Sequence, residues 1–242
     1  MPSTSAPRNH PDAACSVAPY WIVMGDLHDS TARFDAIPGL AEAEGVIVTG
    51  DLTVTGGVAA ARRVLDALSA RNPRILAQIG NMDRGEITDW LESEDRNIHA
   101  RVRLLAPDTA IMGVGGSPFT PFGTPSEFPE ARFADWLDHM WRTARRSRRV
   151  VLVSHTPPRD TRCDRLTDGS HVGSTAVRDF LLECQPDVCL CGHIHEARSL
   201  DRLGRTVLVN PGPLAAGGYA VLSVEERGLS VSLHTLADEC AM

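Results

Sequence analysis

The 242-residue chain lacks three features that would each point to a particular class of protein. It has no run of about 18 consecutive apolar residues, the length that a membrane-spanning helix requires. It has no surplus of basic residues, because its formal net charge is −7, and this argues against a stable nucleic-acid partner held by phosphate contacts. It has only six cysteines, too few for a disulfide framework in a chain of this length.

The first 18 residues are rich in proline, serine and alanine and contain no apolar segment of the kind found in a secretory signal. We therefore expect a flexible tail over residues 1–18 and one folded domain over residues 19–242. Without a secretory signal, the cysteines are expected to be reduced thiols and the protein to be cytoplasmic, with no membrane association.

Short apolar runs alternate with amphipathic stretches along most of the chain. Five runs have the continuous apolar pattern of strands that are covered on both faces: 20–26, 45–51, 74–81, 148–155 and 187–193. Helical spacing occurs over 57–71, 129–146 and 174–184, and Ser174 is a suitable N-cap for the last of these. Short strand patterns follow at 197–203, 205–210, 218–226 and 229–236. The sequence predicts an α/β fold with more than one sheet.

Each of the five apolar runs ends in side chains that can hold a metal ion. These are Asp26 and His28, Asp51, Asn81, His155, and His193 with His195. Ligands bind at the carboxyl ends of strands in open α/β sheets, so these ends can meet at one edge. Glycines at 25, 50, 80 and 192 precede four of these segments and permit the chain to turn sharply there.

Any one of these features alone is weak, since a Gly-Asp pair after a strand is usually a turn. Cys189 and Cys191 share one face of the expected strand 187–193, where free cysteine behaves as a small apolar residue. A structural zinc site that used both cysteines with His193 and His195 would leave the other ligand candidates unexplained. The conjunction of all seven oxygen and nitrogen ligands at strand ends favours a shared metal site.

The ordered set Asp26-x-His28, Gly50-Asp51, Gly80-Asn81-x-Asp83, His155 and Gly192-His193-x-His195 resembles the signature of the calcineurin-like metallophosphoesterase superfamily. The resemblance extends from about Tyr20 to Leu236 and is greatest to the small single-domain prokaryotic members. It implies a four-layer αββα sandwich of two mixed β-sheets flanked by helices, with a dinuclear metal site at the strand ends.

The resemblance also implies how the ligands are shared. One metal would be held by Asp26, His28, Asp51 and His195, and the second by Asp51, Asn81, His155 and His193, with Asp51 bridging. Carboxylate, amide and imidazole ligands suit first-row ions such as Mn, Fe, Zn or Ni. Two such ions can clamp a phosphoryl group and activate a hydroxide for in-line attack on phosphorus. Asn81, His155 and His193 would then also act in catalysis.

The chain departs from the protein-phosphatase branch of that superfamily at two positions. A histidine that acts near the leaving group, and the aspartate that orients it, are replaced here by Met82 and Val54. Methionine cannot protonate a leaving oxygen, which favours a phosphodiester or an activated phosphomonoester as substrate. His171, in a Gly/Ser-rich loop, is a candidate substitute, although an exposed loop histidine without a role is an equal alternative. Asp83 and Asn210 are expected to support the ligands or shape loops.

We therefore expect a hydrolase that acts on a small phosphorylated substrate, with phosphodiesterase activity favoured over monoesterase activity. The alternative is a catalytically weak or inert binding or scaffold protein on the same fold. Proteins of that kind usually have gaps in the ligand set, whereas all seven positions are filled here.

Overall fold

A computed structural model of the chain describes residues 18–237. Seventeen of the 18 residues expected to form a flexible tail lie outside the described part, and that expectation stays a prediction. No helix in residues 18–237 is both long and apolar enough to span a bilayer.

The first sheet has five strands in the order β11-β10-β1-β2-β3. The three parallel strands are β1 (Tyr20–Met24), β2 (Gly45–Val48) and β3 (Ile75–Ala77). The hairpin of β10 (Gly218–Glu225) and β11 (Gly228–Thr235) pairs antiparallel to β1. The chain therefore completes its first sheet with its last two strands.

The second sheet has six strands in the order β4-β5-β6-β7-β9-β8. Its parallel centre consists of β5 (Thr109–Val114), β6 (Arg149–Ser154), β7 (Val188–Leu190) and β9 (Thr206–Asn210). The edge strands β4 (Val102–Ala106) and β8 (Ser199–Leu203) are antiparallel to their neighbours. Both sheets are therefore mixed.

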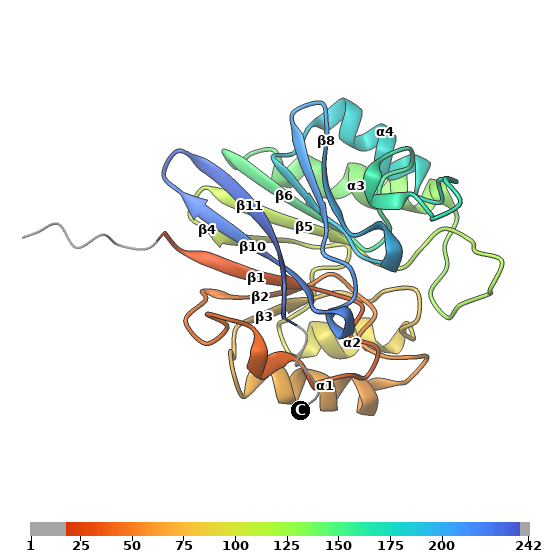
Figure 1. Cartoon of the computed structure of the whole chain (residues 1–242). Coiled ribbons are helices and arrows are strands. Elements are labelled where there is room, and N and C mark those ends of the chain that lie inside the picture. The colour runs from red at the N-terminus through yellow and green to blue at the C-terminus, as the bar shows by residue number, and fades with distance from the viewer. Residues whose placement is uncertain (1–17, 238–242) are drawn as a thin grey trace, which may run out of the picture.

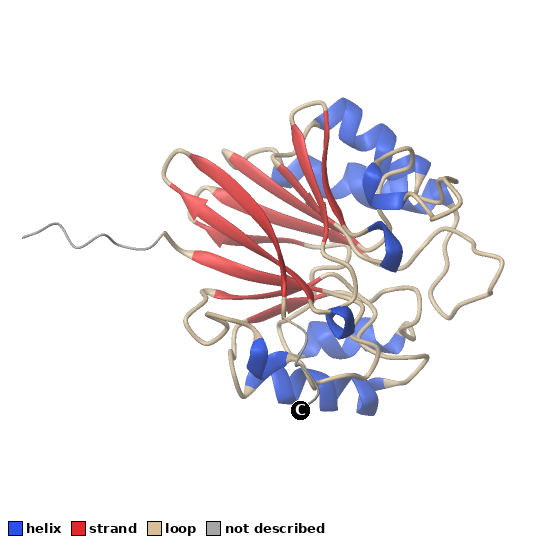
Figure 2. Ribbon diagram, in the orientation of Figure 1, coloured by secondary structure: helices blue, strands red, loops and turns tan. Residues whose placement is uncertain are grey.

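Helices cover the outer face of each sheet, and the inner faces pack on each other (Figures 1 and 2). The helices α1 (Val58–Ser69) and α2 (Glu86–Ser93) pack on the first sheet, and α3 (Glu130–Ala144) and α4 (Thr175–Cys184) pack on the second. Side chains alternate along β1, so both of its faces are buried: Ile22 and Met24 face the α1 side, whereas Trp21 and Val23 lie in the apolar layer between the sheets. The predicted four-layer αββα sandwich is confirmed.

The predicted strands and helices are present with ends trimmed by a few residues. Ser174 caps α4 as expected, since its side chain accepts a hydrogen bond from the backbone N–H of Val177. The structure adds three elements that the sequence patterns did not indicate, namely α2, β4 and β5. Four short 3₁₀ turns lie at Phe34–Ala36, Arg162–Asp164, His195–Ala197 and Leu214–Ala216.

Candidate metal centre

All seven candidate ligands follow the carboxyl ends of parallel strands from both sheets. Asp26 and His28 follow β1, Asp51 follows β2 and Asn81 follows β3 in the first sheet. His155 follows β6, and His193 and His195 follow β7 in the second sheet. The seven side chains meet at this edge of the sandwich and are called the ligand cluster.

The backbone of the ligand cluster is locally strained. Four of its residues have left-handed φ values, with 50° at Asp26, 46° at His28, 52° at Asp51 and 68° at His193. Residues with side chains rarely adopt this conformation, and it persists where the surrounding structure enforces it. Here the loops after β1 and β2 lock together, because the N–H groups of Asp26 and His28 donate to the carbonyls of Gly50 and Asp51, both at 3.0 Å.

Gly80 shows why glycine is required beside the ligands. A Cβ atom at this position would lie 2.0 Å from Oδ1 of Asp51 and 2.4 Å from its backbone nitrogen. Any other residue at position 80 would therefore displace Asp51. At Gly50, φ is +133° and a Cβ would lie 2.5 Å from Nδ1 of His155, so a side chain is excluded there on both counts.

Asp26, His28 and His195 form the first close group of the ligand cluster. Their ligand atoms lie within 4.8 Å of one another. The two histidine Nε2 atoms are 3.1 Å apart, and Nε2 of His195 lies 3.5 Å from Oδ1 of Asp26. Nε2 of His28 lies 3.7 Å from Oδ2 of Asp51, which connects this group to the next.

The second close group contains Asp26, Asp51 and His155, again within 4.8 Å. Nε2 of His155 lies 3.5 Å from Oδ2 of Asp51 and 3.1 Å from Oδ1 of Asn81. The His193 ring lies beside that of His155, with centroids 5.1 Å apart. Asp26 belongs to both groups, and Asp51 also contacts the first group through His28; Asp51 is the residue that the resemblance assigns as the bridging ligand.

The electrostatics of the cluster favour positive charge at its centre. Burial would lower the pKa of His155, but the Asp51 and Asp26 carboxylates raise it to about 9. Burial and the neighbouring His155 lower the pKa of His193 to about 4. Burial opposes ionisation of Asp26, yet a hydrogen bond with His195 and the nearby His155 keep its pKa below the ordinary value. Two buried carboxylates at the cluster therefore attract a cation.

The donor atoms fit divalent metal ions. Two imidazole Nε2 atoms 3.1 Å apart cannot both carry hydrogen toward each other, so at least one presents a lone pair. A cation bound between these nitrogens and the adjacent carboxylates would accept the nitrogen lone pairs and so account for the short distance between the two rings. The ligand cluster contains imidazole nitrogens and carboxylate and amide oxygens but no thiol, a set that suits first-row ions.

Asp83 supports the cluster from behind. Its buried carboxylate accepts hydrogen bonds from the backbone N–H groups of Leu52, Thr53 and Gly80 and from the Thr53 hydroxyl, at 2.8–2.9 Å. Asn210 has a similar place in the second sheet, where its amide donates to the carbonyls of Cys163 and Ile194. Both residues join loops that carry ligands, which agrees with the expectation that they support or shape the site.

Cys189 and Cys191 lie in the apolar layer between the second sheet and α3 and α4, as predicted. Both side chains are fully buried, and their sulfurs are 3.6 Å apart as free thiols. The mutual hydrogen bond and burial raise the pKa of Cys191 well above its ordinary value. Neither cysteine belongs to a group of metal-binding side chains found among the described residues.

His171 is held by a partner that no sequence pattern indicates. Its Nδ1 lies 2.7 Å from Oδ1 of Asp164, a fully buried carboxylate, so Nε2 is the ring nitrogen left for a ligand. Asn81 likewise gains an unexpected contact, because its Nδ2 donates to the Thr124 hydroxyl at 3.0 Å. That hydroxyl donates in turn to Glu127 at 2.7 Å. No periodic or motif signal in the sequence marks Asp164, Thr124 or Glu127.

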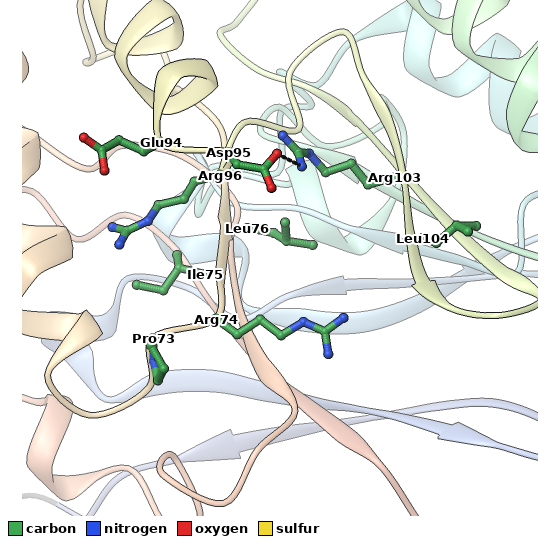
Figure 3. A pocket seen from close by; sticks show the side chains of 9 residues that line it. All are labelled: Pro73, Arg74, Ile75, Leu76, Glu94, Asp95, Arg96, Arg103 and Leu104. Carbon is green, nitrogen blue, oxygen red and sulfur yellow. Dashed lines mark hydrogen bonds and ion pairs between the residues drawn. The ribbon is translucent and has the colours of Figure 1, made fainter.

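A cavity of about 750 Å³ opens beside the ligand cluster. It is lined by Asn81 and His193 from the cluster and by His171. Its other walls come from residues 118–122, from residues 166–173, and from Glu130, Arg159 and Ile194. A separate hollow of about 600 Å³ lies before and along β3, at the opposite end from Asn81 (Figure 3). Figure 3 shows Arg103 turned toward Asp95 in an ion pair there, and no member of the ligand cluster lines this hollow.

Comparisons with known proteins agree with this architecture. Residues 110–233 match the family model described as metallophosphoesterase, calcineurin superfamily. An uncharacterized protein of Methanocaldococcus jannaschii, MJ1162, is 34% identical over 178 residues, which cover 71% of this chain and 78% of that protein. The chain belongs to the calcineurin superfamily of metallophosphoesterases.

Solved structures share the metallophosphoesterase fold. One crystal structure has a TM-score of 0.78 at 16% identity and covers 91% of this chain and 100% of the other. The crystal structure of TT1561 from Thermus thermophilus has a TM-score of 0.68 at 18% identity and covers 89% of this chain and 99% of that one. Family membership and the Asp/His groups support a metal-dependent hydrolase of phosphoester bonds that binds divalent ions.

Proposed function

We propose that this metallophosphoesterase hydrolyses phosphodiesters, or phosphomonoesters with a good leaving group, using two metal ions. The observation that carries the proposal is the meeting of all seven ligand side chains, from five strand ends, at one edge of the sandwich. An inert binding protein would not need the whole set, nor the left-handed backbone at four of its members.

The contacts support the division of ligands expected from the family resemblance. Asp26, His28 and His195 would hold one ion, and Asn81, His155 and His193 the other, with Asp51 shared between them. When bound, the ions would hold phosphoryl oxygens and make a water molecule acidic enough to attack phosphorus near neutral pH. Mn, Fe, Zn and Ni all suit these donors, and manganese is the first ion to test in reconstitution.

Hydrogen bonds from neighbouring residues would orient two of the metal ligands, Asn81 and Asp51. Asn81 is oriented by its hydrogen bond to Thr124, which leaves its Oδ1 directed at Nε2 of His155. Oδ1 of Asp51 accepts a hydrogen bond from the backbone N–H of Met82 at 2.8 Å, so its Oδ2 remains for the two close groups. Orientation of this kind lowers the barrier because the ligands need not rearrange during the reaction.

The preference for diesters or activated esters rests on Met82 and Val54. These residues stand where protein phosphatases of the superfamily have a histidine and its orienting aspartate. Met82 has no proton to donate, and Val54, which is 51% exposed, has no carboxylate to orient a donor. Protonation of the leaving oxygen contributes about 10²–10⁴-fold in enzymes that use it. The chain therefore needs another donor or a leaving group that departs unaided.

His171 is the donor that the structure favours. Hydrogen bonding of its Nδ1 to buried Asp164 fixes the ring, and His171 lines the cavity that also contains Asn81 and His193. With both ring nitrogens protonated and Nδ1–H donated to Asp164, His171 would give its Nε2 proton to a leaving oxygen in that cavity and become the neutral imidazole. The size of the cavity agrees with the proposal that the substrate is a small phosphorylated molecule. The cytoplasmic location expected from the sequence stays part of the proposal.

Elemental analysis followed by parallel kinetic assays tests this function. Chelator-treated protein would be reconstituted with Mn, Fe, Zn or Ni and assayed on bis(p-nitrophenyl) phosphate and p-nitrophenyl phosphate. We expect about two ions per chain, turnover only after reconstitution, and a larger kcat/KM for the diester. Two bound ions without turnover on either compound would contradict the proposal and favour a binding role.

A further inference from the structure

We infer that the cavity beside the ligand cluster is a binding site for an aromatic group of the substrate, which stacks on Phe119 and Phe122. The inference rests on the proposed function, since it names the part of the phosphoester that lies beyond phosphorus. It assigns a role to the loop between β5 and α3, which projects from the sandwich (Figure 1).

The cavity connects the ligand cluster with an apolar rim. Asn81 and His193 line it on the cluster side, and Phe119, Phe122 and Val172 line it farther out. Its volume of about 750 Å³ falls within the range of about 300–1,000 Å³ typical of small-molecule sites. A phosphoryl group at the cluster would therefore direct one of its substituents along this wall.

The exposure of the two phenylalanines calls for a ligand. Phe119 is 72% exposed and Phe122 is 84% exposed. Of the seven large hydrophobic side chains exposed in residues 18–237, three line this one cavity, with Val172 as the third. Apolar side chains gathered at the mouth of a cavity indicate a binding surface more strongly than single ones scattered over a protein.

The polar groups of the cavity are mostly engaged within the protein. The Glu130 carboxylate accepts hydrogen bonds from the Ser174 hydroxyl and from the backbone N–H groups of Thr175 and Ala176. The Thr120 hydroxyl donates to the Glu127 carboxylate, whereas Arg159 has a long ion pair of 3.9 Å between its Nε and Oδ1 of Asp160. The walls thus offer little for the many hydroxyls of a sugar-like substituent, and flat apolar rings suit them better.

The loop that carries the two phenylalanines is held in place. The Glu127 carboxylate accepts hydrogen bonds from the backbone N–H and hydroxyl groups of both Thr120 and Thr124. The N–H of Ser126 donates to the carbonyl of Asn81 at 3.0 Å, which ties the same loop to the cluster. A loop fixed in this way presents Phe119 and Phe122 to a ligand with little ordering to do on binding.

The affinity of metal-loaded protein for two non-hydrolysable probes tests the inference. Calorimetry would compare phenylphosphonate with methylphosphonate, which share the phosphoryl group and differ in the ring. Stacking on an aromatic side chain is worth at least about 1 kcal/mol, so phenylphosphonate is expected to bind at least about fivefold more tightly. A nucleoside phosphonate, with a methylene group in place of the ester oxygen, would show whether a nucleobase or a simple aryl ring is preferred.

The double variant Phe119→Ser/Phe122→Ser should bring the ratio of the two affinities close to one. The matched control, Leu104→Ser/Leu200→Ser, removes two exposed apolar side chains that do not line this cavity and should leave the ratio unchanged. Equal affinities in the unmodified protein, no binding of either probe, or an unchanged ratio in the Phe variant would overturn the inference. Turnover without an affinity difference contradicts only the aromatic site, whereas a fivefold difference without turnover contradicts only the proposed function.

Discussion

Replacement of Asp83 by asparagine should destabilise the fold even in the absence of metal. In the native protein, Oδ2 of Asp83 accepts from the N–H groups of Leu52 and Gly80, and Oδ1 accepts from the N–H and hydroxyl of Thr53. An amide keeps one acceptor oxygen. If that oxygen remains with Leu52 and Gly80, the new NH₂ group can donate to the Thr53 hydroxyl but faces the Thr53 N–H, which loses its partner.

The magnitude follows from these groups. A buried donor left unpaired costs about 1–3 kcal/mol, and hydrogen bonds to a charged acceptor are worth about 1 kcal/mol more than those to a neutral one. Burial and the charge on Asp51 raise the pKa of Asp83 to about 7, so removal of the charge offsets part of this loss. We expect Asp83→Asn to lower the free energy of unfolding by roughly 2–4 kcal/mol.

Urea denaturation of chelator-treated protein, followed by tryptophan fluorescence, measures this change. With an m-value of about 3 kcal/mol/M, the unfolding midpoint should fall by about 1 M. The control Asp135→Asn alters an exposed carboxylate on α3 and should change the stability by less than about 0.5 kcal/mol. If Asp83→Asn falls within the same limit as the control, the hydrogen bonds of Asp83 do not hold the loops together.

Three further outcomes follow from the site. The double variant Cys189→Ala/Cys191→Ala should retain its metal, and elemental analysis that finds the metal lost would place the cysteines among the ligands. His171→Ala should slow hydrolysis of an unactivated phenyl ester by about 10²–10⁴-fold while it spares the p-nitrophenyl ester and the metal content; equal slowing of both esters would rule out a proton-donor role. Thr124→Val removes the acceptor for Nδ2 of Asn81 and should weaken metal affinity by about 10–100-fold, with rescue in Thr124→Ser; a metal titration unchanged by the valine would show that Thr124 does not position Asn81.

The parallel strands β1, β2, β3, β6 and β7 were predictable because they are buried on both faces and read as continuous apolar runs, whereas the equally buried β5 was missed. β4 was missed because it is a short edge strand with a register shift between Leu104 and Ala106, and its residues are mostly half-exposed. α2 was missed because eight residues give only two turns of periodicity. The order of strands within each sheet depends on long-range pairing, such as β1 with β10, which no local pattern encodes.

The ligand cluster was predictable for a related reason, since each ligand directly follows a recognisable strand. The residues that orient the cluster were not. Thr124 reaches Asn81 across 43 residues of sequence, and Asp164 reaches His171 from the short 3₁₀ turn between β6 and α4. Such contacts depend on how loops fold over the sheet edge, and the cavity with its two exposed phenylalanines depends on the same packing.

The most direct test of a two-metal phosphoesterase is the rate of bis(p-nitrophenyl) phosphate hydrolysis measured against metal ions bound per chain, in the unmodified protein and in Asp51→Asn. Asp51 contacts both close groups of the cluster, so its loss should affect both ions. We predict that the rate of the unmodified protein rises as ions bind, and that Asp51→Asn holds fewer than two ions and is at least about 100-fold slower, since metal stabilisation of the transition state is worth several kcal/mol. An Asp51→Asn protein with full metal content and full rate would contradict the account.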